Sequence, residues 1–183
     1  MWRPAVVDVP FERLRHDDKP VHVAEGYGGR PIEHFPPYRF FRQVLAGDPD
    51  GARTGFREWY RQQFGKYAEV PKKRGGMRHG SLDRLVRAVH AREGSAELRA
   101  ELVERAIAER VEQRLALFET LRTQGYDRAR AERIVGIRRR GAVFLTGGQH
   151  RAAALRALEL PALPDVVVLG PAAYWLYRKL GMI

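Results

Sequence analysis

The sequence predicts an α+β fold, with strands at both ends of the chain and helices between them. Short runs rich in β-branched residues that end at proline or glycine, at 5–10 (AVVDVP) and 20–29 (PVHVAEGYGG), are typical of strands. Apolar residues recur at helical spacing between about 38 and 125. After Tyr126 the pattern changes again, to a hairpin, a helix, a buried strand and a last helix. A length of 183 residues suits one substantial core, so we expect a single domain.

The middle of the chain is expected to be helical. Aromatic residues at helical spacing predict two short helices, over 38–45 and 54–64, with a turn between them. The proline-rich segment 30–40 before them is expected to be irregular. Ser81 suits the N-cap of a third helix. A longer fourth helix carries an apolar stripe from Leu98 to Phe118 and is expected to stop near a glycine.

The net charge of +11, from 33 Lys and Arg against 22 Asp and Glu, favours an anionic partner. Acidic and basic residues balance along 82–122, which predicts a solvated helical surface. The excess lies in 71–80, in 128–141 and in arginines between Arg39 and Lys66. Such basic clusters are compatible with nucleic acid as a partner.

Several classes of site and location are disfavoured by composition. The absence of cysteine excludes disulfides and cysteine-ligated metals. The six histidines show neither H-x-x-x-H nor H-E-x-x-H spacing, so no metal site is expected; they stand at 16, 22, 34, 79, 90 and 150. No stretch approaches the roughly 18 apolar residues of a membrane span, and the start lacks a signal-peptide pattern. We therefore expect a cytoplasmic protein with no membrane partner.

The junction 146–151 (TGGQHR) is the strongest candidate for a site. A strand is expected to end at Leu145, and the two glycines permit a tight turn that leaves backbone N–H groups exposed at a helix start. Helix N-termini attract anions, yet His150 and Arg151 place basic side chains in the first turn, which costs about 0.3–1 kcal/mol. A bound phosphate or carboxylate would reverse this cost. The alternative is that Arg151 curls back to solvent or to a nearby glutamate.

The run VFLTGGQHRAAALRALELPALPDVVVL, at 143–169, resembles the central box of the ParB/sulfiredoxin-like superfamily. That box is a strand, a G-x-H-R type turn, a helix of small residues, a leucine-proline turn and a strand. The resemblance is strongest to a branch with a GG-x-HR box and an upstream segment like RPIEHFPPYRFF at 30–41. It implies one domain over 1–183, with a small mixed β-sheet of ParB/sulfiredoxin type, a large helical insertion over about 38–125 and a core box over about 133–180.

The resemblance also implies a binding site for a nucleoside triphosphate or diphosphate with Mg²⁺. Its phosphate-binding residues would be Gly147, Gly148, Gln149, His150 and Arg151, with Arg39 lining the pocket. Many relatives carry Asp or Glu at this turn, where this chain has glycine, so a carboxylate is expected from elsewhere. Glu33 is the candidate general base or Mg²⁺ ligand, and Glu25 is its rival. The alternative is that Glu33 only pairs with Arg30 or Arg39.

These observations predict a nucleotide- or phosphate-binding protein, with a kinase-like phosphotransferase acting on a small hydroxylated metabolite as the favoured activity. Glu33, His150 and Arg151 would be its catalytic residues, with Arg151 stabilising the transferred phosphoryl group. Two alternatives stay open. One is a ParB-like DNA-binding module that contacts phosphates through 71–80 and 137–141. The other is a non-catalytic regulatory domain.

Overall fold

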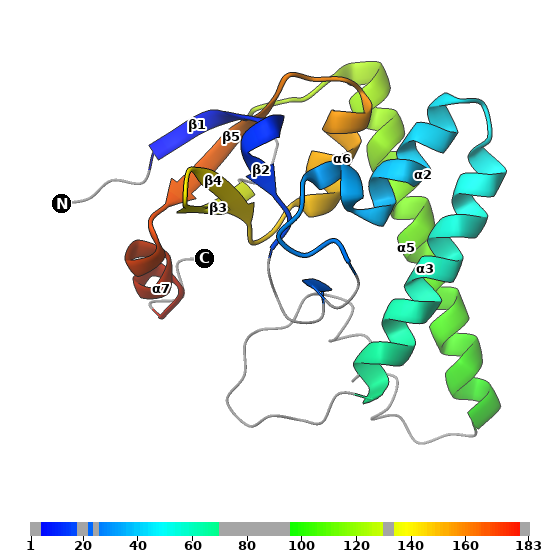
Figure 1. The fold of residues 1–183 in the computed structure, drawn as a ribbon. Helices are drawn as coiled ribbons and strands as arrows, with labels where there is room; N and C mark the ends of the chain where they lie inside the picture. Colours follow the sequence, from blue (N-terminus) through cyan, green and yellow to red (C-terminus); the bar gives the residue numbers. More distant parts are fainter. Residues whose placement is uncertain (1–4, 18–21, 24–25, 70–95, 130–133, 180–183) are drawn as a thin grey trace.

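The computed structural model describes residues 5–17, 22–23, 26–69, 96–129 and 134–179. These residues form a five-stranded mixed sheet and five helices (Figure 1). The strands are β1 (Ala5–Pro10), β2 (Leu14–Arg15), β3 (Ile134–Arg139), β4 (Ala142–Leu145) and β5 (Ala162–Leu169). The helices are α2 (Pro36–Leu45), α3 (Pro49–Glu69), α5 (Ala96–Gln124), α6 (Gln149–Ala157) and α7 (Pro171–Lys179). Two 3-10 turns are η1 (Phe11–Arg13) and η2 (Ile32–His34).

The sheet combines strands from the two ends of the sequence, in the order β1-β5-β3-β4-β2. The pairs β5–β3 and β4–β2 are parallel, and the other two pairs are antiparallel. Although β2 has only two residues, it pairs with β4 through Leu14–Val143 and Arg15–Phe144. Since this pair is parallel, the chain leaves β2 and β4 at the same edge of the sheet.

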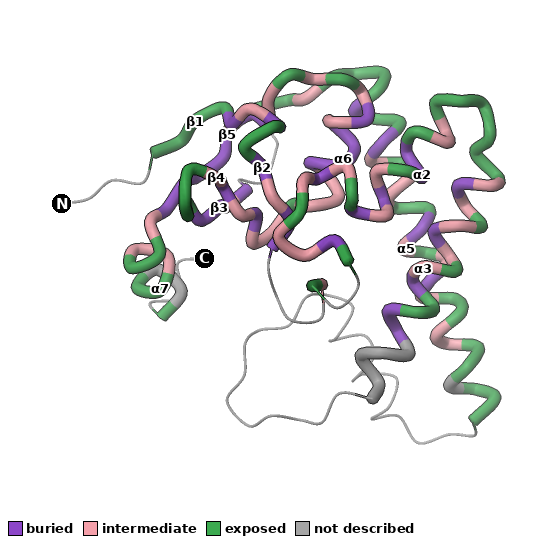
Figure 2. The backbone as a smooth tube through the Cα atoms, viewed as in Figure 1, coloured by how far each residue is buried: buried purple, intermediate pink, exposed green. Residues whose placement is uncertain are grey.

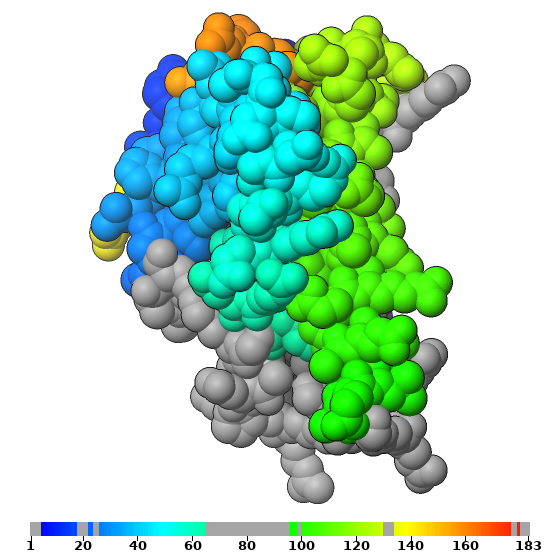
Figure 3. All heavy atoms as spheres, turned by 90° about the vertical axis from the view of Figure 1, so that its right-hand side faces the viewer, coloured from blue at the N-terminus to red at the C-terminus, as the bar shows by residue number. Residues whose placement is uncertain are grey.

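Helix α6 lies between the sheet and the helices α2, α3 and α5 (Figure 1). Its alanines Ala152, Ala153 and Ala154 are fully buried, because small side chains let the helix pack closely on both sides. Beyond it, α3 and α5 run side by side along one face of the molecule (Figure 3). Buried residues form one cluster that continues from the sheet through α6 into these helices, while their outer faces are exposed (Figure 2).

Aromatic stacking fixes the helices to one another. Phe41 of α2 is fully buried, and its ring stacks on Phe118 of α5 at a centroid distance of 4.7 Å. The ring of Phe56, from α3, lies 5.4 Å from Phe41 on another side. Phe41 therefore joins three helices through two aromatic contacts. None of the described helices is long and apolar enough to cross a bilayer.

Most predicted elements are confirmed in position and type. The strand at 5–10 is β1, the helices predicted at 38–45 and 54–64 lie within α2 and α3, and the long fourth helix is α5, which ends one residue before Gly125. The hairpin, the helix and the last strand predicted after Tyr126 are β3–β4, α6 and β5. The mixed α+β class is thereby confirmed. The helix predicted from Ser81 and the basic loop at 71–80 lie outside the described residues.

Two predictions are wrong. The strand expected at 20–29 is absent from the described part of that range, where residues 22–23 form a helical turn and Gly26 and Gly29 take left-handed φ angles of 84° and 70°. The segment 30–40 is not irregular throughout, because α2 begins at Pro36. Prolines at the first positions of a helix lose no hydrogen bond there, so they start α2 rather than prevent it.

Candidate functional site

Two parallel strands deliver the site residues to one edge of the sheet. His16 and Asp17 directly follow β2, and the turn Thr146–Gly148 directly follows β4. The carboxyl ends of neighbouring parallel strands are where open α/β sheets bind ligands. A hydrogen bond of 3.2 Å from Gln149 Nε2 to Asp17 Oδ2 joins the two segments. Asp17 therefore places a carboxylate beside the turn, and so supplies from another segment the carboxylate that the turn itself lacks.

The turn before α6 requires glycine at one position. Gly148, the N-cap residue of α6, has a left-handed φ of 72°. A Cβ atom on it would lie 2.7 Å from Cγ1 of Ile134, so a side chain is excluded by conformation and by space. Among the described residues no side chain caps α6, so the backbone N–H groups of its first turn have no side-chain acceptor there. This start of α6 carries the positive end of the helix dipole.

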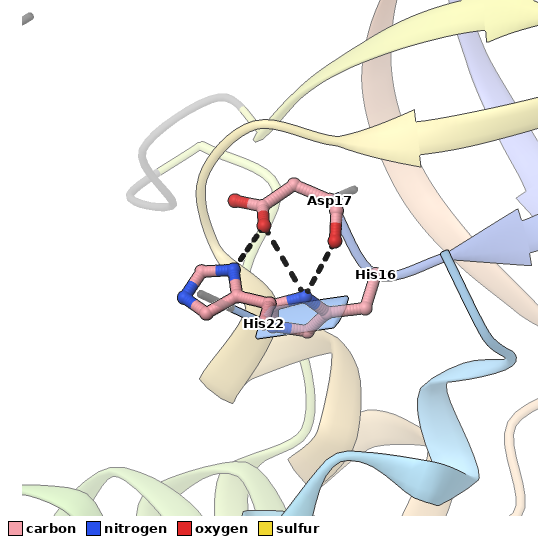
Figure 4. Close-up of side chains that lie close together, drawn as sticks. All are labelled: His16, Asp17 and His22. Carbon is pink, nitrogen blue, oxygen red and sulfur yellow. Dashed lines mark hydrogen bonds and ion pairs between the residues drawn. The ribbon is translucent and has the colours of Figure 1, made fainter. Parts of the chain in front are cut away.

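His16, Asp17 and His22 form a buried cluster at this edge (Figure 4). His16 is 2% exposed and Asp17 is 5% exposed. Nδ1 of His22 contacts Oδ1 of Asp17, and Nδ1 of His16 lies 3.4 Å from the same oxygen. The ring of Tyr27 packs against both imidazoles, at centroid distances of 4.8 and 5.3 Å. The ligand atoms of the three cluster residues lie within 4.8 Å of one another, so they can hold one metal ion.

His150, the second residue of α6, lies among aromatic rings. Its Nε2 is 3.2 Å from the hydroxyl of Tyr60, and the rings of Phe35 and Trp59 lie 5.2 and 5.9 Å from its own. Burial lowers the pKa of His150 well below its ordinary value, and the positive charges of Arg114 and Arg110 lower it further. His150 is therefore a neutral imidazole at pH 7, and not the cation expected from the sequence.

The two arginines that act on the pKa of His150, Arg110 and Arg114, both belong to α5. They stand four residues apart and so share one face of α5. Burial raises the pKa of Tyr60, which a hydrogen bond from Arg114 partly opposes. Nε of Arg114 is buried and has no acceptor among the described residues. Because buried polar groups are nearly always hydrogen-bonded, this N–H suits an acceptor supplied by a bound ligand.

The structure brings only some of the predicted site residues together. Gly147, Gly148, Gln149 and His150 lie at the turn as expected, next to Asp17. Arg151 is half-buried and contacts Tyr126: burial raises the pKa of Tyr126, and the charge and hydrogen bond of Arg151 oppose this rise.

The remaining predicted residues lie apart from the turn. Oε1 of Glu33 accepts a 2.7 Å hydrogen bond from Nε of Arg156, in the last turn of α6, rather than pairing with Arg30 or Arg39. Arg39 is exposed on α2, and Glu25 lies outside the described residues. The catalytic role expected of Glu33 would require this ion pair to open.

Sequence reasoning missed the His16–Asp17–His22 cluster and the Arg110–Arg114 pair. The histidines were judged by helical metal motifs, but His16 and His22 meet through a loop, which has no fixed spacing. The available signal was a His-Asp pair with a second histidine six residues after the first. Arg110 and Arg114 lie in a helix of balanced charge, and only their position beside Ile107 and Val111 of the buried stripe distinguishes them from the solvated arginines.

The cluster suits some metals and not others. Mg²⁺ prefers an octahedral set of oxygen ligands, whereas this cluster offers two imidazole nitrogens and one carboxylate. The Mg²⁺ expected with a nucleotide therefore does not fit it.

A cavity of about 220 Å³ lies away from this cluster, against β1, β3 and β4. It is lined by Val7, Asp8, Val9, Pro10, Arg13, Arg138, Gly141 and Val143. None of these residues belongs to the candidate site.

Comparison of the chain with protein-family models, curated proteins and solved structures gave no match.

Proposed function

We propose that this chain is a phosphate-ester-binding enzyme, for which a nucleotide is the first candidate ligand, and that it transfers a phosphoryl group at the start of α6. The observation that carries the proposal is that an uncapped helix N-terminus and a buried carboxylate meet at the start of α6, where the charge of Arg114, whose Nε–H has no acceptor among the described residues, acts on His150. Phosphoryl transfer needs mainly positioning and stabilisation of negative charge, which these groups supply.

The phosphate would bind between α6 and α5. Within the part of the chain that the structure describes, the N–H groups of the first turn of α6 lack a capping side chain and Nε of Arg114 lacks an acceptor. A phosphate oxygen is a strong acceptor for both kinds of donor. In this proposal Arg114, backed by Arg110, takes the role that the sequence analysis gave to Arg151.

The carboxylate of the site would be Asp17 rather than Glu33. Asp17 is held beside the turn by Gln149, whereas Glu33 is bonded to Arg156 farther along α6. His150, neutral and bonded to Tyr60, would contact the ligand as a hydrogen-bonding group without charge. We also propose that the fold is of ParB/sulfiredoxin type, which the succession β4, glycine turn, α6 and β5 supports.

Calorimetric titration with ATP, ADP, CTP, GTP and inorganic phosphate, each with Mg²⁺, tests the proposal. We expect at least one of these ligands to bind, and Arg114→Gln to weaken that binding about 10-fold to 100-fold, as for loss of a charged hydrogen bond. Arg105→Gln is the matched control, because Arg105 lies on the same helix with 77% of its side chain exposed. The proposal fails if no ligand binds the unmodified protein, or if both variants bind equally well.

Nucleic acid is the second candidate ligand, and one observation favours it. Arg138, Arg139 and Arg140 are all exposed at the β3–β4 hairpin, where Arg140 and Gly141 take the left-handed φ angles of 49° and 79° typical of a tight two-residue turn. Contacts from such a tip to several backbone phosphates would make binding weaken steeply with salt. Failure of a duplex to bind would exclude nucleic acid as the ligand, and duplex binding that is unchanged when all three arginines are replaced with glutamine would exclude this hairpin as its contact surface.

A further inference from the structure

We infer that His16, Asp17 and His22 form a binding site for one divalent transition metal ion, of the Zn²⁺ class, with coordination positions left for a non-protein ligand. This inference does not depend on the proposed function, because the site is complete without a phosphate ligand.

The geometry of the donor atoms is the first support. Ligands of one Zn²⁺ ion lie about 2.0–2.2 Å from it, and therefore at most about 4.4 Å from one another. The ligand atoms of His16, Asp17 and His22 already lie within 4.8 Å. Both Nδ1 atoms approach the same carboxylate oxygen of Asp17, so a metal ion between them needs only small side-chain shifts.

The second support is burial. The side chains of His16, Asp17 and His22 are 2%, 7% and 13% exposed. Burial of a carboxylate is unfavourable unless its charge is compensated. A divalent cation compensates this charge and uses both imidazoles in their neutral form, which is the form that binds metals.

The third support is that the backbone holds the two halves of the cluster. The N–H of Gly29 donates to the carbonyl oxygens of His16 and Asp17, at 3.2 and 3.1 Å. The N–H groups of Tyr27 and Gly28 donate to the carbonyl oxygen of His22, at 3.2 and 2.8 Å. A Cβ atom on Gly28 would overlap the backbone, so this close approach requires glycine. The cluster is thus fixed by four backbone hydrogen bonds that do not involve its side chains.

The fourth support is the outer partner of the carboxylate. While Oδ1 of Asp17 faces the imidazoles, Oδ2 accepts a hydrogen bond from Gln149 Nε2 at 3.2 Å. Metal-binding carboxylates are commonly oriented by such a second hydrogen bond. Gln149 is the first residue of α6, so a metal ion here would lie next to the proposed phosphate site.

The donor types select the class of metal. Imidazole nitrogen with one carboxylate suits Zn²⁺, Co²⁺, Ni²⁺, Mn²⁺ or Fe²⁺, whereas Ca²⁺ and Mg²⁺ require more oxygen ligands. Three protein ligands with open positions are typical of catalytic rather than structural zinc. An open position would accept water or an oxygen of a phosphate ester.

The test is titration of the chelator-treated full chain with Co²⁺ alone and then with Zn²⁺, in the absence of nucleotide. We expect one equivalent of Co²⁺ to give the visible absorption of a low-coordinate cobalt site, and one equivalent of Zn²⁺ to displace it. Ca²⁺ and Mg²⁺ should not displace it. Zn²⁺ should also raise the thermal unfolding temperature, because an ion that binds only the folded state stabilises it.

Variants locate the site. His22→Ala should weaken Zn²⁺ binding by more than about 100-fold, and Gln149→Leu by about 10-fold to 100-fold. His34→Ala is the matched control, since His34 is exposed on η2. His22 is the most exposed of the three ligands, and circular dichroism checks that its variant is folded. Failure of the unmodified protein to bind Co²⁺ or Zn²⁺, or unchanged binding in folded His22→Ala, would overturn the inference and leave the imidazoles as hydrogen-bond donors to Asp17.

Discussion

The hydroxyl of Tyr60 lies 3.2 Å from Nε2 of His150, and the two rings are nearly parallel, at 12°. This contact joins α3 to the start of α6 across 90 residues of sequence. It also places His150 where a proton is unfavourable, among aromatic rings and near the charges of Arg110 and Arg114.

The first prediction is a dependence of stability on pH that originates at His150. Its pKa in the folded state is well below the ordinary value of 6.5, so the unfolded state takes up the proton first as pH falls. The stability contributed by neutral His150 is therefore present above about pH 6.5 and is lost as pH falls below it, by up to about 1.4 kcal/mol per pH unit. Urea unfolding at several pH values, on the unmodified protein and on His150→Gln, should give a smaller slope for the variant. Equal slopes would mean that His150 is not the group responsible.

The second prediction concerns the two glycines of the turn. Gly148→Ala should lower the free energy of unfolding by about 1–3 kcal/mol, because it combines a left-handed φ with overlap on Ile134. Gly147→Ala is the matched control, since a Cβ atom there meets nothing within 4 Å. Urea unfolding of both variants measures the difference. A similar loss in both would argue against the turn geometry described.

The third prediction concerns the aromatic contact between helices. Phe41→Ala should cost about 3–5 kcal/mol, because it removes a fully buried ring that packs on Phe118 and Phe56. Leu45→Ala, on the same helix at 39% exposure, should change stability by less than about 0.5 kcal/mol. Chemical denaturation distinguishes the two, and a small effect at Phe41 would contradict the packing of α2 on α5.

The fourth prediction separates two ion pairs of different exposure. Glu33→Gln should cost about 1–2 kcal/mol, because it weakens the charged hydrogen bond to Arg156 in a half-buried site. Glu119→Gln weakens an ion pair with Arg122 whose side chains are about half exposed, 50% and 52%, and should cost less than Glu33→Gln, because water screens exposed pairs. Matching losses in thermal or urea unfolding would show that the Glu33–Arg156 pair adds no more than a surface pair.

The sequence predicted most of this fold because its elements have strong periodic signals. The apolar stripe of α5, the alanines of α6 and the β-branched run of β5 each match one type of element, and glycine marks the turn between β4 and α6. Gly148 in particular lies in the turn after β4 and is the N-cap of α6. These signals lie within short stretches of sequence, so they can be recognised without knowledge of the tertiary structure.

The rest of the site depends on contacts between distant segments. A strand of two residues such as β2 carries no periodic signal, so the parallel pairing that brings Asp17 to Gln149 could not be predicted. Similarly, Arg110 and Arg114 differ from other arginines of α5 only in which neighbour they face. That face is set by the packing of α3, which the ion pairs Arg53–Glu112 and Arg61–Glu104 hold in antiparallel register on α5. Neither relationship is encoded in the spacing of residues along the chain.

The pairing of β1 with β5 also affects when the protein can fold during translation. Ala5 lies opposite Val168, so the first strand has no partner until nearly the whole described chain has left the ribosome. At synthesis rates of about 5–20 residues per second, this delay is about 8–30 seconds. Helices α2, α3 and α5 emerge earlier and can pair before the sheet forms. The phosphate site proposed at the start of α6 needs Asp17 together with the turn after β4, so it cannot form in a ribosome-bound chain that lacks β4 and α6.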